Sequence, residues 1–272
     1  MNSPVISPSF VVTHEHRRFA EFCQACHDYR YIGLCYGHAG VGKTLSARQY
    51  TRWDLVEPHL TYPTGKEFVA EEIAHCRALF YTPSVVNSPR QLQDDLLHGC
   101  RRLSVLVAEA EHPEPESLNL HLLWQQADRV ELILIDEADW LKTITLEQVR
   151  AIYDQRQIGL ILIGMPGMEK RLSRYPQLYS RVGFVHHYRP LSVAETRQVL
   201  QHHWSQQLLG LEHGDYADAA AMAAIIRMTS GNFRLLERLL SQIGRIMTIN
   251  GLALVTQEVV EAARESLVIG SA

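Results

Sequence analysis

The sequence predicts an α/β fold, in which helices flank a parallel sheet of five strands and a small α-helical lid domain follows. Apolar runs of strand length alternate with helical patterns, and only helical patterns remain after Pro190. The 272 residues are 46% hydrophobic and 21% charged, which suffices for one large or two modest domains with their own cores. We expect residues 1–189 to form an N-terminal helix plus the α/β domain, and residues 190–272 to form the lid.

Five near-continuous apolar runs are the expected strands, since a parallel sheet is covered on both faces. They are Tyr31–Tyr36, Ala78–Thr82, Glu131–Ile135, Gly159–Ile163 and Val182–His187. Helical patterns cover Glu15–Tyr29, Thr44–Trp53, Pro89–Glu109, Leu118–Arg129 and Thr145–Gln155. Right-handed crossovers bring the carboxyl ends of the strands to one edge, where we expect the functional site.

The lid is expected to begin with an N-terminal capping box, because Ser192 is followed three residues later by Glu195. Its helices are expected to break at Gly210–Gly214, Ser230-Gly231 and Asn250-Gly251.

The segment after the first expected strand matches the pattern G-x-x-x-x-G-K-[ST]. Its glycines allow backbone N–H groups to surround phosphates, and the following helix directs its positive dipole end at them. Lys43 is expected to reach the β- and γ-phosphates, and the Thr44 hydroxyl to ligate Mg²⁺. The predicted nucleotide-binding residues of this phosphate-binding loop are Gly37, His38, Ala39, Gly40, Val41, Gly42, Lys43 and Thr44. A nucleoside triphosphate with Mg²⁺ is the expected ligand.

A second nucleotide signal is the acidic pair after the third expected strand. Asp136 is placed to hold Mg²⁺, and Glu137 to polarise the attacking water. The letters Asp136-Glu-Ala-Asp139 also name a helicase group, but a helicase needs a second motor domain, so Asp139 is interpreted as an ordinary loop acid. Many ATPases of this layout carry a polar residue after the fourth strand to orient water. Gly164 and Met165 replace it here, so either another residue fills the role or hydrolysis is slow.

Two arginines are candidates for contacting the γ-phosphate. Arg181 precedes the fifth strand, where an arginine finger would reach a neighbouring subunit's nucleotide; a surface arginine is the alternative, and Arg174 the second choice. Arg234 lies in the first turn of an expected helix, where the dipole disfavours a cation. We therefore favour a ligand role for Arg234 over a solvated one.

Composition excludes several classes of protein. The net charge of −4 excludes a bulk polycation, and neither a signal peptide nor a membrane span is visible, so we expect a cytoplasmic protein. The five cysteines suit a reducing compartment. Cys23 and Cys26 have the spacing of a metal or redox pair, but no second pair accompanies them, so we favour buried positions on a helix.

With these motifs in order, the chain resembles the AAA+ ATPases, and among them the regulators of DNA transposition MuB, TnsC and TniB. The resemblance rests on Gly37–Thr44, Ile133–Asp139, Leu162–Gly167, Tyr179–Arg181 and Gly231–Arg234. It implies a homo-oligomeric ATPase that assembles with ATP on double-stranded DNA as a ring or helical filament. It further implies recruitment of a DDE-type transposase, in some relatives under a TniQ-like targeting protein, and slow hydrolysis coupled to disassembly.

Contacts to DNA phosphates require several basic side chains. The candidates are Arg90, Arg101, Arg102, Lys142, Thr143 and Arg150, each with a solvated helix face as the alternative. Two other functions stay open: a helicase-loader or initiator-like ATPase, and a secretion-type, nucleotide-gated interaction switch that binds no DNA. We expect a loader to carry a helicase-binding module and a secretion ATPase to carry a membrane or peptidoglycan-binding segment. Neither pattern is visible, which favours the transposition hypothesis.

Overall fold

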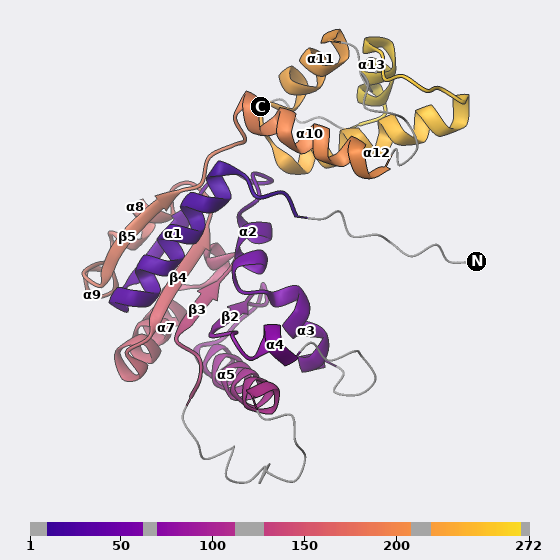
Figure 1. Ribbon diagram of the computed structural model, residues 1–272. Coiled ribbons are helices and arrows are strands. Elements are labelled where there is room, and N and C mark those ends of the chain that lie inside the picture. Colours follow the sequence, from indigo (N-terminus) through magenta and orange to yellow (C-terminus); the bar gives the residue numbers. More distant parts are fainter. Residues whose placement is uncertain (1–9, 62–69, 112–127, 208–218, 268–272) are drawn as a thin grey trace. The chain divides into compact units, whose positions relative to one another are not determined.

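The computed structural model describes residues 10–61, 70–111, 128–207 and 219–267 (Figure 1). The chain divides into two compact units. The sheet unit comprises Arg18–Gly37 and Lys43–Tyr188. The helical unit comprises Met1–Arg17, His38–Gly42 and Arg189–Ala272, so the middle of the phosphate-binding loop groups with the C-terminal helices.

The sheet has five strands in the order β2-β3-β4-β1-β5, and every neighbouring pair is parallel. All residues of β3 and β4 are buried, as expected for central strands covered on both faces, whereas the edge strand β5 alternates in exposure. The predicted fold class is confirmed, and each predicted strand ends within one residue of the observed one. The strands are β1 (Ile32–Tyr36), β2 (Ala78–Tyr81), β3 (Leu132–Ile135), β4 (Gly159–Gly164) and β5 (Val182–His187).

The helices of this part of the chain follow the predicted order. The expected helix Thr44–Trp53 ends earlier, at Tyr50, and a separate helix starts at Trp53, because Arg52 between them adopts a left-handed φ of 52°. Most of the expected helix Leu118–Arg129 lies outside the described residues. The elements are α1 (His14–Tyr29), α2 (Lys43–Tyr50), α3 (Trp53–Thr61), α4 (Ala70–Ile73), α5 (Pro89–Glu111), the 3₁₀ helix η2 (Ala138–Trp140), α7 (Thr143–Arg156), α8 (Met168–Leu172) and α9 (Pro176–Tyr179).

Helix α1 packs on the sheet through small and aromatic side chains, and Figure 1 shows it lying over the sheet beside β4 and β5. A Cβ on Gly33 of β1 would stand 2.4 Å from the Cys26 sulfur, so only glycine permits this close approach. Burial raises the pKa of the Cys26 thiol to about 12 and raises that of Cys23 as well. Both thiols therefore stay protonated and serve as packing groups. Among the described residues, no group of three or more His, Cys, Asp or Glu side chains could hold a metal ion.

The helical unit has its own apolar core, which includes Leu200, Ile225, Leu236 and Val260. Its described helices are α10 (Val193–Gln207), α11 (Ala219–Thr229), α12 (Phe233–Asn250) and α13 (Gln257–Glu265). In none of the four described ranges is a helix both long and apolar enough to cross a membrane.

Two predicted features of the helical unit are confirmed. The capping box forms, since Ser192 Oγ accepts from Glu195 N at 3.2 Å and Glu195 Oε2 accepts from Ser192 N at 2.9 Å. Gly231 and Gly251 have positive φ at the ends of α11 and α12. The break expected at Gly210–Gly214 lies outside the described residues.

Candidate nucleotide site

The strand order places the phosphate-binding loop and the acidic pair after β3 on either side of the end of β4. β4 lies between β1 and β3, so Gly37 after β1 and Asp136 after β3 flank the end of β4 at Gly164. Gly37 N donates to Gly164 O at 3.3 Å, and Tyr36 pairs with Gly164 in the sheet register. Ligands of open parallel sheets bind at this carboxyl edge.

The glycines of the phosphate-binding loop are required by its conformation. Gly40 and Gly42 have φ values of 78° and 110°, which side-chain-bearing residues rarely adopt. At Gly37 a Cβ would stand 2.3 Å from the carbonyl oxygen of Tyr188. The loop is thus a glycine-dependent backbone turn of the kind that surrounds phosphates.

Lys43 is the first residue of α2, and its Nζ donates to Gly37 O at 2.6 Å. Burial lowers the pKa of this amine, while the negative charges of Asp136, Glu137 and Asp139 act in the opposite direction. A triphosphate would supply further negative charge to this half-buried cation. Lys43 therefore has the position and the charge to bind phosphate.

Thr44 and Asp136 form the part of the site that fits a magnesium ion. Thr44 Oγ1 donates to Asp136 Oδ2 at 2.6 Å, which places two hard oxygen ligands side by side. Asp136 is 3% exposed, and its Oδ1 accepts from Glu137 N at 2.9 Å. Burial raises the pKa of Asp136, and the hydrogen bonds from Thr44 and Glu137 N oppose that shift. The donor set suits Mg²⁺, which would neutralise this buried charge.

Glu137 occupies a turn directly after Asp136 in the chain. It has left-handed φ and ψ of 48° and 39°, and η2 starts at the next residue. Left-handed backbone in a non-glycine residue is uncommon and concentrates at functional sites. Its role as the base that polarises water stays a prediction.

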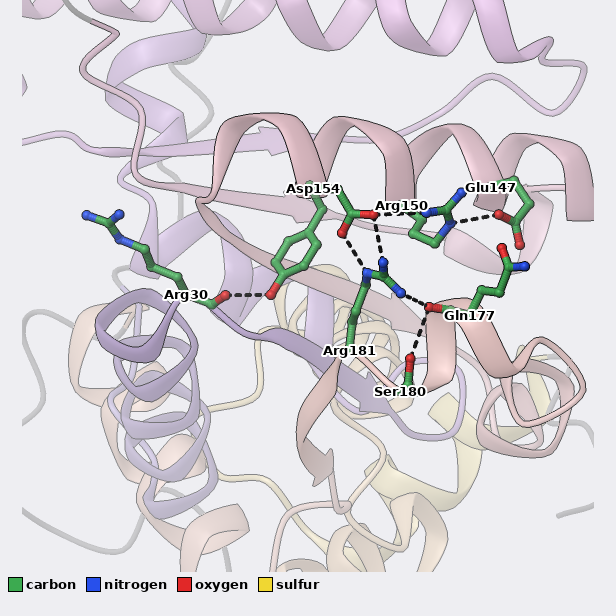
Figure 2. A network of polar contacts seen from close by, with 8 residues as sticks. Arg30, Glu147, Arg150, Asp154, Gln177, Ser180 and Arg181 are labelled. Carbon is green, nitrogen blue, oxygen red and sulfur yellow. Dashed lines mark hydrogen bonds and ion pairs between the residues drawn. The ribbon is translucent and has the colours of Figure 1, made fainter.

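Arg181 lies in an ion-pair network at the opposite edge of the sheet (Figure 2). Its Nε and Nη2 donate to Asp154 at 2.6 and 2.8 Å, and its Nη1 bonds to Gln177 O. These bonds lower the pKa of Asp154. Because Arg181 O accepts from Ile32 N at the start of β1, the length of β1, roughly 16 Å, separates it from Gly37. Arg181 therefore lies far from the nucleotide residues of its own chain.

Arg234 lies beside the middle of the phosphate-binding loop, within the helical unit. Its backbone N donates to Gly40 O at 2.9 Å, and its side chain is exposed. The preceding Asn232 side chain makes two bonds: Nδ2 donates to Ala39 O at 2.9 Å, and Oδ1 accepts from Leu235 N at 3.1 Å. Asn232 thus caps α12 and holds the loop at once, a role that the sequence analysis did not assign. Its position as the N-cap of an expected helix was the available signal.

The structure brings only some of the DNA-contact candidates together. Arg90 and Lys142 are exposed and follow β2 and β3 at the carboxyl edge, where Asn87 Nδ2 bonds to Trp140 O at 3.3 Å. Arg101 lies about three turns further along α5, in a shallow hollow that Asp94 and Asp95 also line.

Of the remaining candidates for DNA contact, one is half-buried and two already contact other side chains. Arg102, on the same helix, is half-buried. Thr143 Oγ1 lies 2.6 Å from the hydroxyl of Tyr175. Arg150 pairs with Glu147 and with Asp154, the acid that also holds Arg181 (Figure 2).

A glycine-dependent loop of the phosphate-binding pattern, a buried acid beside it and a parallel sheet are typical of nucleotide-binding proteins of α/β fold. Comparisons agree: residues 26–172 match the AAA domain family. The chain is also 43% identical over 270 residues to a potential ATP-binding protein of Staphylococcus aureus, covering 96% of this chain and 97% of that protein. The chain therefore belongs to the AAA domain family of ATPases.

Solved structures of low sequence identity share the fold. The RuvB Holliday junction branch migration motor of Thermotoga maritima is 16% identical with a TM-score of 0.59, covering 96% of this chain and 71% of RuvB. The ORC1 protein of Aeropyrum pernix, solved in complex with DNA, is 20% identical with a TM-score of 0.55, covering 94% of this chain and 65% of ORC1.

Proposed function

We propose that this AAA-family ATPase assembles with ATP and Mg²⁺ on double-stranded DNA and recruits a DDE-type transposase for target-site selection. The observation that carries the assembly step is the placement of Arg181 at the opposite edge of the sheet from Lys43. An arginine so placed acts on a γ-phosphate only when it belongs to a neighbouring subunit. Nucleotide then joins two subunits, and hydrolysis separates them.

The DNA step rests on the exposed carboxyl-edge cations Arg90 and Lys142, next to the exposed Val85 and Val86. One such pair per chain binds DNA weakly, but an assembly repeats it with every subunit, so phosphate contacts accumulate. The likeness in fold to ORC1, whose structure was solved in complex with DNA, also supports binding to DNA. The transposase, and in some systems a TniQ-like protein, follows from the motif resemblance to MuB, TnsC and TniB.

Imaging by negative-stain electron microscopy tests the assembly. We expect rings or filaments only when ATP, or a slowly hydrolysed analogue, and duplex DNA are both present. Lys43→Ala should abolish them because it removes the phosphate-binding cation, and Glu137→Gln should trap them because hydrolysis is blocked. Monomers under every condition would contradict the proposal, and DNA-independent assemblies would favour the nucleotide-gated interaction switch.

Paired charge variants test the DNA surface. Arg90→Ala combined with Lys142→Ala should reduce the salt dependence of DNA binding, by about 0.9 in the log–log slope for each DNA phosphate that the protein no longer neutralises. The exposed Arg30→Ala, at the amino edge of the sheet, is the matched control and should leave the slope unchanged. Equal effects of the two variants would contradict this surface assignment. Stimulation of strand transfer by a purified DDE-type transposase, with and without ATP, tests the recruitment step.

A further inference from the structure

The end of β4 lacks the polar side chain that many ATPases of this layout use to orient water. Gly164 and Met165 stand there, and Gly164 is paired with Tyr36 of β1 and bonded through its carbonyl to Gly37 N. Its position next to the phosphate-binding loop and the magnesium acid is the one in which such a side chain would act. The sequence left open whether another residue fills the role.

The carboxylate of Asp139 occupies that place. Its Oδ2 accepts from Met165 N at 2.6 Å. A Cβ added to Gly164 would stand 2.5 Å from this same oxygen and 2.5 Å from the Met168 sulfur. A side chain at position 164 and the observed Asp139 carboxylate therefore exclude each other. Glycine at 164 is what makes room for Asp139.

The backbone around Asp139 is held so that the carboxylate turns back toward β4. The left-handed conformation of Glu137 starts the turn, and η2 continues it. Arg171 Nη1 then donates to Asp139 O at 2.9 Å, and its Nη2 bonds to Leu141 O. The half-buried Asp139 is thus fixed at both its main chain and its side chain.

The charge of Asp139 reaches the nucleotide residues. Burial lowers the pKa of Lys43 and raises that of Asp136; the negative charge of Asp139 opposes the first shift and adds to the second. A carboxylate has about four lone-pair sites, so the bond from Met165 N leaves acceptor capacity for a water molecule. Only Ala138 separates it in the chain from Glu137, the predicted base.

We infer that Asp139 is a positioning residue for ATP hydrolysis. It follows β3 in the chain, and its carboxylate occupies the place of the polar side chain that is absent at Gly164. Its carboxylate fixes the end of β4 and orients the attacking water beside Glu137. The inference rests on the ATPase part of the proposed function and is independent of DNA and transposase. Sequence patterns missed it because the two positions lie 25 residues apart in the chain and meet only in the fold.

Steady-state ATP hydrolysis, with and without duplex DNA, tests this with a swap of the two positions. Asp139→Ala should lower kcat about 10- to 100-fold while KM for ATP changes less than about 3-fold. Adding Gly164→Asn should restore part of the lost kcat, because Asp139→Ala removes the carboxylate from this space and the flexible Met168 side chain can shift away from the added Cβ. The matched control, Asp139→Ala with Gly164→Ala, should restore nothing. Equal recovery in both double variants would reduce the role to packing and overturn the inference.

Asp139→Asn covers the case in which Asp139→Ala fails to fold. The amide oxygen still accepts from Met165 N, but the group left over is an N–H donor that cannot accept a hydrogen bond from water. We expect a lowered kcat at unchanged KM, and a wild-type kcat would overturn the inference. Hydrolysis by the wild type no faster than by Lys43→Ala would instead refute the ATPase function itself, and the inference with it.

Discussion

At the residue scale, the buried carboxylate of Asp136 links ATP chemistry to stability. Burial raises its pKa in the folded chain above the unfolded value, so the ionised form costs stability once the pH exceeds the folded pKa. The neutral carboxyl group contributes its full share of folding stability only below the unfolded pKa of about 3.9. This stability is lost as the pH rises through the folded pKa.

Asp136→Asn should therefore raise the unfolding temperature of the nucleotide-free protein at pH 7, by roughly 2–4 °C, while abolishing Mg²⁺-dependent hydrolysis. Asparagine keeps both hydrogen bonds, with Nδ2 donating to Thr44 and Oδ1 accepting from Glu137 N. The gain should shrink as the pH falls through the folded pKa of Asp136. Thermal unfolding in EDTA across pH 4–8 measures it, with the exposed Asp94→Asn as control. An equal gain at pH 4 and pH 7 would contradict the burial argument.

At the element scale, Asn232 joins the start of α12 to the phosphate-binding loop. Its Oδ1 caps the helix and its Nδ2 holds Ala39 O, so the two functions separate by substitution. Asn232→Asp keeps the cap but loses the donor and places a negative charge at the loop. We expect unchanged thermal stability and about 10-fold weaker ATP binding, whereas Asn232→Ala should also lose about 1 kcal/mol of stability.

A matched cap elsewhere isolates the loop effect. Thr256 Oγ1 accepts from Val259 N at 3.4 Å at the start of α13. Thr256→Ala should cost similar stability without changing ATP affinity in a fluorescent-nucleotide titration. Wild-type affinity in Asn232→Asp would show that the bond to Ala39 does not shape the loop.

The elements most readily predicted were those whose structure is indicated by residue types that are neighbours in the sequence. Continuous apolar runs indicated the strands, and the glycine and acidic motifs indicated the nucleotide residues, because backbone conformation and burial restrict residue types there. Thr44 and Asp136 were each predicted from a motif, and their contact depends on the strand order, which no local pattern records. Asp139 and Asn232 escaped, since their roles depend on contacts with Met165 and Ala39 that no local pattern records. The split of the helix expected at 44–53 depended on one left-handed arginine, a residue without turn propensity.

At the scale of the whole molecule, hydrolysis should require two chains. Arg181 is held by Asp154 at the amino edge, but both side chains are about one-third exposed, 32% and 33%. Exposed ion pairs are worth roughly 0–1 kcal/mol, so a γ-phosphate on a neighbouring subunit competes easily for this arginine. In the proposed function, this pair is the resting position of Arg181, and assembly replaces it.

Mixing two inactive variants tests this requirement. Lys43→Ala lacks a working loop but keeps Arg181, while Arg181→Ala keeps the loop but lacks the arginine. Each alone should lose at least about 100-fold in hydrolysis. An equal mixture should recover about a quarter of the wild-type rate, because about one interface in four then joins an intact loop to an intact arginine. Arg174→Ala, mixed in the same way, is the comparison for the second-choice arginine. A mixture as inactive as its components, with wild-type assembly by light scattering, would remove Arg181 from the site.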